Sequence, residues 1–515
     1  MNNEPLALTI DFGTQSVRAM IFNKKGDSLA IEKKVYEPPY FSSKPGYAEQ
    51  NPHYYWEAMC HVTKALSQKN PDLLLDVTTM AITSFRDTAV LLDKDLKVVR
   101  PSILWLDQRQ ALKKTKYGLL RNIIFSLTGL SETVKMNSRR TAARWIMNEE
   151  PENWSKTAHY INVSTYFTLL LTGKLIDSSA NQAGHYPIDF KKGVWYKDNA
   201  LKAPIFEIPS KLLCQLVKPG EKLGEITHQC HLETGLPEGL PIYANGSDKG
   251  SETIGTGCIT SDMASISYGT ASSIEVSNSK YIEPEPFLPA YPASIPNLYN
   301  MEVQIYRGYW MVTWFKKEFG TTESTEAAIL KMTTEDVLNK AMMKIPPGSQ
   351  GLVLQPYWGP GLRRPEAKGA IIGWSDFHTH THLYRAIVEG IAYGLREGLE
   401  GIEKRQHRKV KEIRVSGGGS QSDAICQITA DVFGIPVSRV QTFETSSLGT
   451  AILAFTAHGD FPSYDEAVNA MVHRSITFLP DSKNHNRYNY LYKEVYIQLY
   501  GKLKKMYKKI RDFNE

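Results

Sequence analysis

Asp11–Arg18 reads DFGTQSVR, and this segment is the strongest local signal in the chain. The apolar run Leu6–Ile10 before it predicts a buried strand, and Gly13 permits a tight turn that most side chains would disfavour. Val17–Phe22 is apolar after the turn, so a second strand follows where a P-loop or Rossmann site would begin a helix. The pattern therefore predicts a β-hairpin whose turn binds an anion through its backbone N–H groups.

The side chains of this turn suit phosphate. Asp11 cannot bind phosphate itself, but a carboxylate at a strand end can hold Mg²⁺ that bridges to phosphate oxygens. The candidate phosphate site, with Asp11 as the metal ligand, comprises Asp11, Gly13, Thr14, Gln15, Ser16 and Arg18. An Asp-x-Gly-Thr pattern alone is weak, because ordinary turns also use Asp and Gly.

Two further glycine turns strengthen the case. SYGTAS at 267–272 predicts a second hairpin, with Gly269 and Thr270 in its turn, and we expect the two hairpins to clamp a phosphate chain across a cleft. EIRVSGGGSQSD at 412–423 predicts a strand, a glycine turn and a helix from about Ser420. An ordinary strand-to-helix turn is the alternative, but three consecutive glycines favour a flat surface for a ring or ribose. The candidate residues there are Gly417, Gly418, Gly419 and Asp423.

The length and pattern predict two domains. A single hydrophobic core stops growing at about 250–300 residues, and this chain has 515. Each hairpin is followed by alternating strands and helices, which is α/β patterning repeated once. We place the boundary in the glycine-rich run 246–257, giving an N-terminal domain of 4–255 and a C-terminal domain of 256–515.

The composition of the chain indicates its cellular location and the kinds of partner it binds. The sequence shows no signal peptide, no apolar run of about 20 residues and five scattered cysteines without a CxxC pair, so we expect a cytoplasmic protein without a membrane partner. The net charge of +6 equals the six basic residues of 502–511. That stretch has the spacing of an amphipathic helix. A membrane or nucleic-acid contact is one interpretation; packing on its own domain is the one we favour, with no nucleic acid bound.

Seven motifs then match one family in order. The chain resembles the FGGY carbohydrate kinases, which include glycerol kinase, xylulokinase and gluconate kinase. The motifs are DFGTQSVR (11–18), SFRDT (84–88), ILWLDQR (103–109), NGSDKG (245–250), YGT (268–270), the C-terminal signature (369–390) and SGGG (416–419). The resemblance implies two duplicated actin-like ATPase domains, of the ribonuclease H-like α/β class, around a central nucleotide and substrate cleft. It also implies ATP and Mg²⁺ as cofactors and a small sugar, polyol or sugar acid as phosphate acceptor.

The resemblance also assigns roles in the reaction. Asp248 matches the family's catalytic acid and would remove the proton of the attacking hydroxyl. Arg86 and Asp87 match the acceptor-gripping pair of glycerol kinase, and an ordinary surface ion pair is their alternative. Trp105 suits an aromatic wall for the substrate, or equally a core position. Asp107, with Arg109, would close the same site.

Some features leave the acceptor and the activity open. Asn137 aligns where glycerol kinase has a tyrosine, and Asp87 replaces a longer glutamate, so a pentose, ketose or sugar acid fits better than glycerol. Alternative functions for the same fold are a non-kinase ATPase and a sugar sensor. The sequence is compatible with a homodimer but does not determine the oligomeric state. The run DFHTHTH (376–382) is interpreted as a polar surface loop rather than a zinc site. We expect 383–402 to form a core helix at the domain interface.

Overall fold

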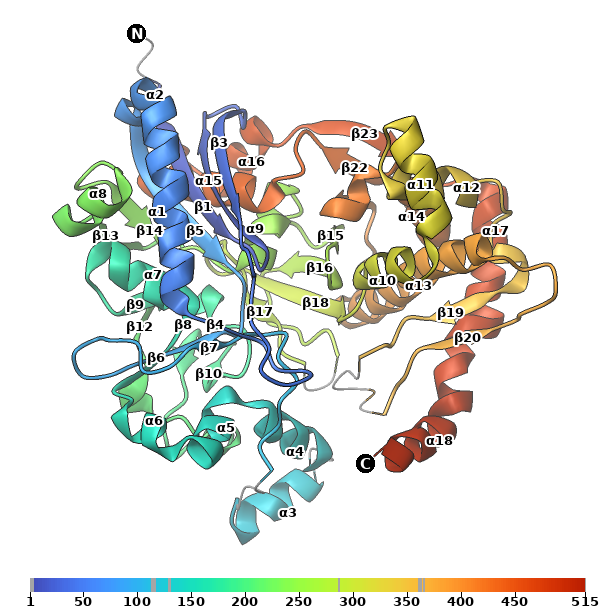
Figure 1. The fold of residues 1–515 in the computed structure, drawn as a ribbon, viewed down its shortest axis with the longest axis horizontal. Coiled ribbons are helices and arrows are strands. Elements are labelled where there is room, and N and C mark those ends of the chain that lie inside the picture. Colours follow the sequence, from blue (N-terminus) through green and yellow to red (C-terminus); the bar gives the residue numbers. More distant parts are fainter. Residues whose placement is uncertain are drawn as a thin grey trace. The chain divides into compact units, whose positions relative to one another are not determined.

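The computed structural model describes residues 4–112, 117–127, 131–285, 288–359, 364 and 366–514. The chain forms two compact units (Figure 1). Unit 1 comprises Met1–Gly255, Tyr291–Leu298 and Ser446–Met471, and unit 2 comprises the remaining segments Thr256–Ala290, Tyr299–Thr445 and Val472–Glu515. Two segments from the C-terminal half of the sequence therefore belong to unit 1, which a division at one point of the chain does not capture.

A six-stranded mixed sheet forms the centre of unit 1. Its strands are β1 (Leu6–Phe12), β2 (Ser16–Phe22), β3 (Ser28–Val35), β5 (Val77–Ser84), β13 (Lys222–Glu225) and β14 (Pro241–Tyr243). Their order is β13-β14-β5-β1-β2-β3. The β1–β2–β3 meander is antiparallel, β1 pairs parallel with β5, β5 pairs parallel with β14, and β13 closes the edge antiparallel. All seven residues of β1 are buried, which explains its unbroken apolar run.

The sheet of unit 2 repeats this topology. Its strands are β15 (Met263–Tyr268), β16 (Ser272–Asn278), β18 (Tyr299–Ile305), β21 (Glu412–Ser416), β22 (Val437–Val440) and β23 (Arg474–Phe478). They follow the order β18-β16-β15-β21-β22-β23, again with an antiparallel meander, two parallel pairings and an antiparallel edge strand. The predicted duplicated α/β fold is therefore confirmed, and the two glycine hairpins occupy equivalent places in the two sheets.

Helices and smaller sheets complete each unit. The helices of unit 1 are α1 (Pro52–Lys69), α2 (Pro71–Leu75), α3 (Leu119–Leu127), α4 (Ser131–Arg140), α5 (Ala142–Glu149), α6 (Pro151–Lys156), α7 (Val163–Thr172), α8 (His228–Thr234), α9 (Asp248–Gly255), α15 (Thr445–His458, from Ser446) and α16 (Tyr464–Met471). A second sheet of unit 1 has the order β4 (Glu49–Gln50), β7 (Ser102–Ile103), β6 (Ala89–Leu92) and β8 (His159–Asn162). Shorter strands are β9 (Ile176–Ser178), β10 (Ile188–Asp189), β11 (Val194–Trp195), β12 (Gln215–Val217) and β17 (Tyr291–Pro292).

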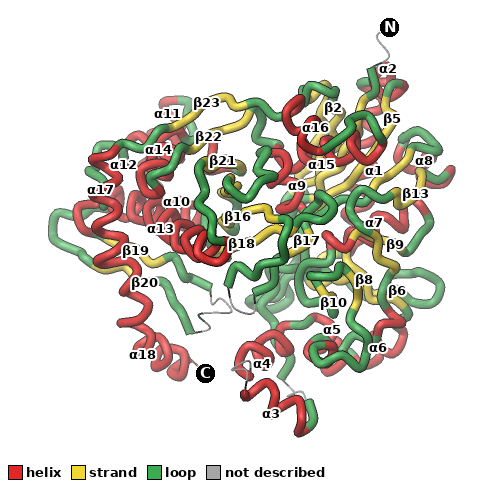
Figure 2. The backbone as a smooth tube through the Cα atoms, turned by 180° about the vertical axis from the view of Figure 1, so that it is seen from behind, coloured by secondary structure: helices red, strands yellow, loops and turns green. Residues whose placement is uncertain are grey.

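The helices of unit 2 surround one long buried helix. They are α10 (Trp310–Phe319), α11 (Thr321–Leu330), α12 (Thr334–Met342), α13 (His380–Gln406), α14 (Asp423–Phe433), α17 (Ser482–Leu491) and α18 (Ile497–Asn514), with the hairpin β19 (Val353–Gln355) and β20 (Ala370–Ile372). α13 lies against β18 (Figure 2), and a Cβ on Gly398 would come within 2.8 Å of Val303. The core position predicted for this helix is confirmed, and its glycines Gly390, Gly394 and Gly398 serve close packing inside unit 2.

Two local expectations need correction. The run 376–382 is not all loop, because α13 begins at His380 and Thr379 caps it in a capping box with His382. The helix expected from about Ser420 begins at Asp423, after a 3₁₀ turn over Gly418–Gln421. Ser422 caps that helix by accepting from the backbone N–H of Ile425.

The glycine-rich run 246–257 is mostly helix rather than linker. α9 occupies 248–255 of it and is largely buried. A Cβ on Gly246 would lie 2.1 Å from Ser294 Oγ, so the glycine serves close packing rather than flexibility. α15 packs equally closely on α9, because a Cβ on Gly449 would lie 1.8 Å from the carbonyl oxygen of Ser251.

Gly449→Ala tests this close contact. We expect the free energy of unfolding to fall by about 1–3 kcal/mol, because the new methyl group must displace a backbone carbonyl that cannot rotate away. Gly401→Ala is the matched control. Gly401 lies inside α13, and a Cβ there would meet nothing within 4 Å, so alanine should stabilise by up to about 1 kcal/mol. Chemical denaturation of both variants is the measurement, and equal effects would contradict the packing.

The basic C-terminal helix packs on its own unit, as predicted. Tyr507 of α18 is buried and donates a hydrogen bond of 2.6 Å to Gln355 Oε1. Lys504 lies 3.5 Å from Glu366. A membrane span is not found: within the described residues, no helix is both long and apolar enough to cross a bilayer.

Candidate active site

The predicted phosphate turn joins β1 to β2. The backbone N–H of Gly13 donates to the carbonyl oxygen of Ser16 at 2.9 Å, which closes the turn. Tyr36 fixes the turn from beside it, because its N–H donates to the Gln15 carbonyl at 2.9 Å. Asp11 and Arg18 face each other across the hairpin, with 3.6 Å between Oδ2 and Nη1. The hairpin is therefore a rigid element with a carboxylate and a guanidinium at its base.

Trp105 connects the acceptor segment to this turn. Its indole Nε1–H donates to Thr14 Oγ1 at 3.0 Å, and its backbone N–H donates to Thr88 Oγ1 at 3.3 Å. The ring is half-buried against the core of unit 1. Trp105 therefore packs on the core and also lies beside the turn at 11–18, while its role as a wall for the substrate stays a prediction.

Asp248 lies at the start of α9, with Arg86 nearby. Burial raises the pKa of its carboxyl group, while the positive charges of Lys249 and Arg86 act against that shift without cancelling it. Its Oδ1 accepts the backbone N–H of Lys249 at 2.9 Å, and Lys249 pairs with Glu252 at 2.8 Å. The result is a carboxylate whose proton affinity is higher than that of an ordinary aspartate, which suits a general base.

α15 secures the backbone around Asp248. Ser446 Oγ donates to the Asp248 carbonyl oxygen at 3.3 Å. Asn245 Nδ2 donates to Thr450 Oγ1 at 3.0 Å and also to the Ile82 carbonyl at the end of β5. The segment carrying the candidate base is thus held between α15 and the central sheet.

Asp87 has a partner that the sequence motifs do not reveal. Its Oδ1 accepts the backbone N–H of His185 at 2.8 Å, and its Oδ2 lies 2.7 Å from His185 Nδ1. Asp87 has a φ of +53°, a region that non-glycine residues rarely occupy. Gly184, with a φ of +127°, is required beside it, because a Cβ there would lie 2.4 Å from Asp87 Oδ1.

This contact shifts the pKa values of both partners. Burial would raise the pKa of Asp87, but the charge and hydrogen bonds of His185 outweigh it and the pKa is lowered. Burial likewise opposes protonation of His185, but Asp87 outweighs it and the pKa of the imidazole is raised. The pair is therefore an aspartate–imidazolium ion pair over a wider pH range than a free histidine would allow.

Arg86 and Asn137 lie in different surroundings. The Arg86 guanidinium lies over the ring of Tyr291, 5.5 Å from its centroid. Asn137 is half-buried on α4, three residues before Arg140. Electrostatic contact between Arg140 and His185 places this end of α4 near the Asp87–His185 pair.

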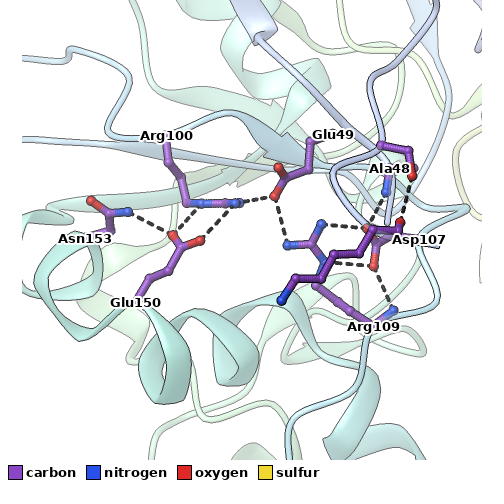
Figure 3. A network of polar contacts seen from close by, with 9 residues as sticks. Ala48, Glu49, Arg100, Asp107, Arg109, Glu150 and Asn153 are labelled. Carbon is purple, nitrogen blue, oxygen red and sulfur yellow. Dashed lines mark hydrogen bonds and ion pairs between the residues drawn. The ribbon is translucent and has the colours of Figure 1, made fainter. Parts of the chain in front are cut away.

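Asp107 belongs to a buried ion network rather than facing an open space (Figure 3). Its side chain is 2% exposed, and it accepts hydrogen bonds from Ala48 N–H at 2.6 Å and from Arg109 Nη2 at 2.8 Å. Arg109 also pairs with Glu49, which in turn pairs with Arg100. Tyr47 and Trp145 cover the Arg109 guanidinium, with centroids at 4.0 and 4.4 Å. Through these bonds Asp107 holds the 103–109 segment in place.

The second glycine hairpin turn, at Gly269–Thr270 in unit 2, is anchored by the start of α10. The N–H groups of Tyr309 and Trp310 donate to the carbonyl oxygens of Gly269 and Thr270, both at 3.2 Å. Thr270 is exposed at the tip. The turn therefore matches the first one in position on its sheet and presents a hydroxyl outward.

The triple-glycine turn packs directly on this hairpin. Gly417 has a φ of +76°, and a Cβ there would lie 2.9 Å from the Tyr268 backbone. A Cβ on Gly419 would lie 2.4 Å from the Tyr309 ring, whereas Gly418 is exposed with nothing within 4 Å. Asp423 is exposed and pairs with Arg439 at 2.8 Å. Two of the glycines are thus required by packing, and Gly418 leaves an open surface.

The residues present fit a magnesium ion bound with substrate rather than a protein cage. Among the described residues, no group of three or more His, Cys, Asp or Glu side chains is placed to hold a metal. Mg²⁺ bound by one or two carboxylates plus phosphates and water needs no such cage. Asp11, at the base of the phosphate turn, fits that mode. The same finding gives no support to a zinc site at 376–382.

Within unit 1 the structure brings several predicted residues together. Trp105 contacts the phosphate turn, and Arg86 and Asp248 interact electrostatically, while Asp107 lies in the separate ion network. The residues that sequence reasoning missed are His185, Arg140, Tyr291 and the supporting helix α15. His185 is 98 positions from Asp87 in no recognised motif, so only the fold reveals the pair.

Comparison with known proteins agrees with this geometry. Residues 6–255 match the N-terminal domain, and residues 264–458 the C-terminal domain, of the FGGY family of carbohydrate kinases. The chain therefore belongs to that family, whose members are phosphotransferases with an alcohol group as acceptor. It is 29% identical to the uncharacterised sugar kinase YgcE of Escherichia coli over 95% of this chain and 92% of the relative. It is 26% identical to the xylulose kinase of Lactococcus lactis over 99% of both chains.

A solved structure shows the same fold. The gluconate kinase of Lactobacillus acidophilus matches with a TM-score of 0.82 and 22% identity, over 98% of this chain and 99% of that one. The two domain matches confirm the family-level prediction: the chain is an FGGY carbohydrate kinase.

Proposed function

We propose that this kinase transfers the γ-phosphate of Mg-ATP to a hydroxyl of a pentose, ketose or sugar acid rather than glycerol. The observation that carries the proposal is the position of Asp248, a half-buried carboxylate of raised pKa that interacts with Arg86. Phosphoryl transfer needs positioning, charge neutralisation and removal of the alcohol proton. Asp248 supplies the last of these.

The remaining candidate residues divide between nucleotide and acceptor. The turns at 11–18 and 268–270 bind the phosphates, the 416–419 turn binds the adenosine, and Asp11 holds Mg²⁺, which neutralises phosphate charge when bound. Arg86, Asp87 and Trp105 bind the acceptor, with Asn137 at its far end and Asp107 supporting the segment that carries Trp105. The named xylulose and gluconate kinases among the relatives, together with Asn137 and Asp87, support an acceptor larger than glycerol.

Because the pKa of Asp248 is raised, the pH profile of kcat/KM should have an acidic limb. The general base must be unprotonated, so kcat/KM should fall as the pH decreases through a value above that of an ordinary aspartate. Arg86→Gln removes a positive charge that lowers this pKa, so the limb should move to higher pH whatever the variant does to the rate. A pH profile of kcat/KM measures both, and an unmoved limb in Arg86→Gln would contradict the assignment.

A screen of acceptors tests the proposal as a whole. ADP release is followed with Mg-ATP and a panel of polyols, pentoses, ketoses and sugar acids, with glycerol included. We expect release to depend on an acceptor of five or six carbons and to be slow with glycerol. ATP hydrolysis of equal rate with and without every acceptor would favour the ATPase alternative. Binding of a sugar without any turnover would favour the sensor.

A further inference from the structure

We infer that His185 binds the acceptor directly, as an imidazolium held by Asp87, and that the acceptor it selects is a sugar acid. This inference rests on the proposed function, since it names the substrate class of the same site. It changes the role of the predicted Arg86–Asp87 pair: Asp87 becomes the residue that orients a contact, and His185 becomes the contact.

The geometry of the pair assigns these roles. Both oxygens of Asp87 already accept hydrogen bonds from His185, one from the backbone N–H and one from the ring at Nδ1. The ring then has Nε2 as its second donor when protonated. The His185 side chain is 28% exposed, and no hydrogen bond to Nε2 is found among the described residues. The imidazolium is thus oriented on one side and available on the other.

The surroundings fix this orientation. Asp87 occupies a left-handed backbone conformation, and Gly184 allows the close approach of the His185 segment. A non-glycine residue with positive φ costs free energy and usually persists where the surrounding structure requires it. Tyr160 and Tyr186 lie side by side with ring centroids 5.8 Å apart, and burial together with the nearby charge of Asp87 raises the pKa of both hydroxyls.

The charges around His185 favour an anion. The charged groups that face the pair or the base are Arg86, Asp87, Arg140, His185 and Asp248. Three of these are cations and two are carboxylates, and the Lys249–Glu252 pair beside Asp248 is neutral as a whole. Within the described part of the chain, Arg140 has no ion-pair partner. One monoanionic acceptor would balance the set, and a carboxylate accepts from an imidazolium and a guanidinium together.

The test compares two acceptors of the same length and stereochemistry that differ only at one end. A six-carbon aldonate and the corresponding alditol are assayed with the full-length protein and Mg-ATP, and a six-carbon 2-ketose is the third acceptor. We expect the wild type to prefer the aldonate in kcat/KM by about 10- to 100-fold, the range for a hydrogen bond to a charged group. A wild type that prefers the alditol or the ketose overturns the inference and leaves the kinase assignment intact.

Two variants separate contact from positioning. His185→Asn keeps a donor near the Nδ1 position for Asp87 but loses the distal donor, and His185→Gln keeps a distal donor without the charge. If His185 contacts the acceptor as a cation, both variants lose the preference for the aldonate, mainly through KM, while KM for ATP is unchanged. A His185→Asn variant with wild-type preference shows a purely positioning role and overturns the inference.

The pH dependence gives an independent readout. Asp87 raises the pKa of His185, so the wild-type preference should persist above the pH at which a free histidine loses its proton, and should fall as the pH rises through the raised value. Asp87→Asn should move this fall to lower pH.

Arg140→Gln provides a further variant test if the His185 variants do not fold. It leaves the Asp87–His185 pair intact and should also reduce the preference for the aldonate. A preference that is independent of pH and unchanged in Arg140→Gln overturns the inference, and a protein that phosphorylates no acceptor overturns the proposed function itself.

Discussion

Asp248→Asn should reduce kcat by about 10²- to 10⁴-fold, the range that a positioned general base contributes. Asparagine has the same shape and can still accept the backbone N–H of Lys249, so the start of α9 should remain folded. It cannot accept the proton of the attacking hydroxyl. The measurement is acceptor-dependent ADP release under saturating Mg-ATP.

The control for this variant is Asp262→Asn. Asp262 pairs with Arg408 on the surface of unit 2 and has no place in the proposed reaction. That change should leave kcat as in the wild type. Nucleotide binding, followed by thermal shift with ADP, should be preserved in both variants. A wild-type kcat in Asp248→Asn would show that another group takes the proton.

Arg109→Met should lower the free energy of unfolding by about 3–5 kcal/mol, because it leaves the buried Asp107 carboxylate without its guanidinium partner. The Arg109 side chain is 3% exposed and pairs with Asp107 and Glu49. Burial opposes the charge on Arg109, but these two carboxylates outweigh it and raise the pKa of the guanidinium. Arg109 is therefore charged in this network, and its removal leaves Asp107 without a counter-charge.

Arg408→Met is the matched control for Arg109→Met. Arg408 is 53% exposed in its pair with Asp262, and surface pairs contribute about 0–1 kcal/mol. Urea denaturation of both variants gives the two values. The comparison also decides the role of Asp107: an acceptor-binding network would show an Arg109→Met protein of normal stability with a raised KM for the acceptor.

The parts of the fold that follow local chemistry were predictable from the sequence. The strand–turn–strand at 6–22 could be derived because Gly13 and the apolar runs beside it specify a hairpin, and the same holds for 263–277. Helix starts were less accurate, since Thr379 and Ser422 are caps whose side-chain bonds the periodicity of apolar residues does not show.

The parts that depend on distant contacts were not predictable. The glycine-rich sequence at 246–257 is equally compatible with a linker and with close packing. Only the contacts of Gly246 with Ser294 and of Gly449 with Ser251 show that it is closely packed. α15 enters unit 1 from nearly 200 residues beyond Asp248, as its bond from Ser446 shows. Likewise, the sequence marks Asp87 as a candidate ligand but not its pairing with His185.

The most direct test of the central claim is the dependence of ADP release on an acceptor. Purified protein is assayed with Mg-ATP alone and with each acceptor of the panel, and the product is checked for a phosphorylated sugar, polyol or sugar acid. A kinase whose base is Asp248 should release ADP at a rate that rises with acceptor concentration and saturates, and Asp248→Asn should lower that saturating rate by about 10²- to 10⁴-fold. ADP release of the same rate with and without every acceptor would contradict the account.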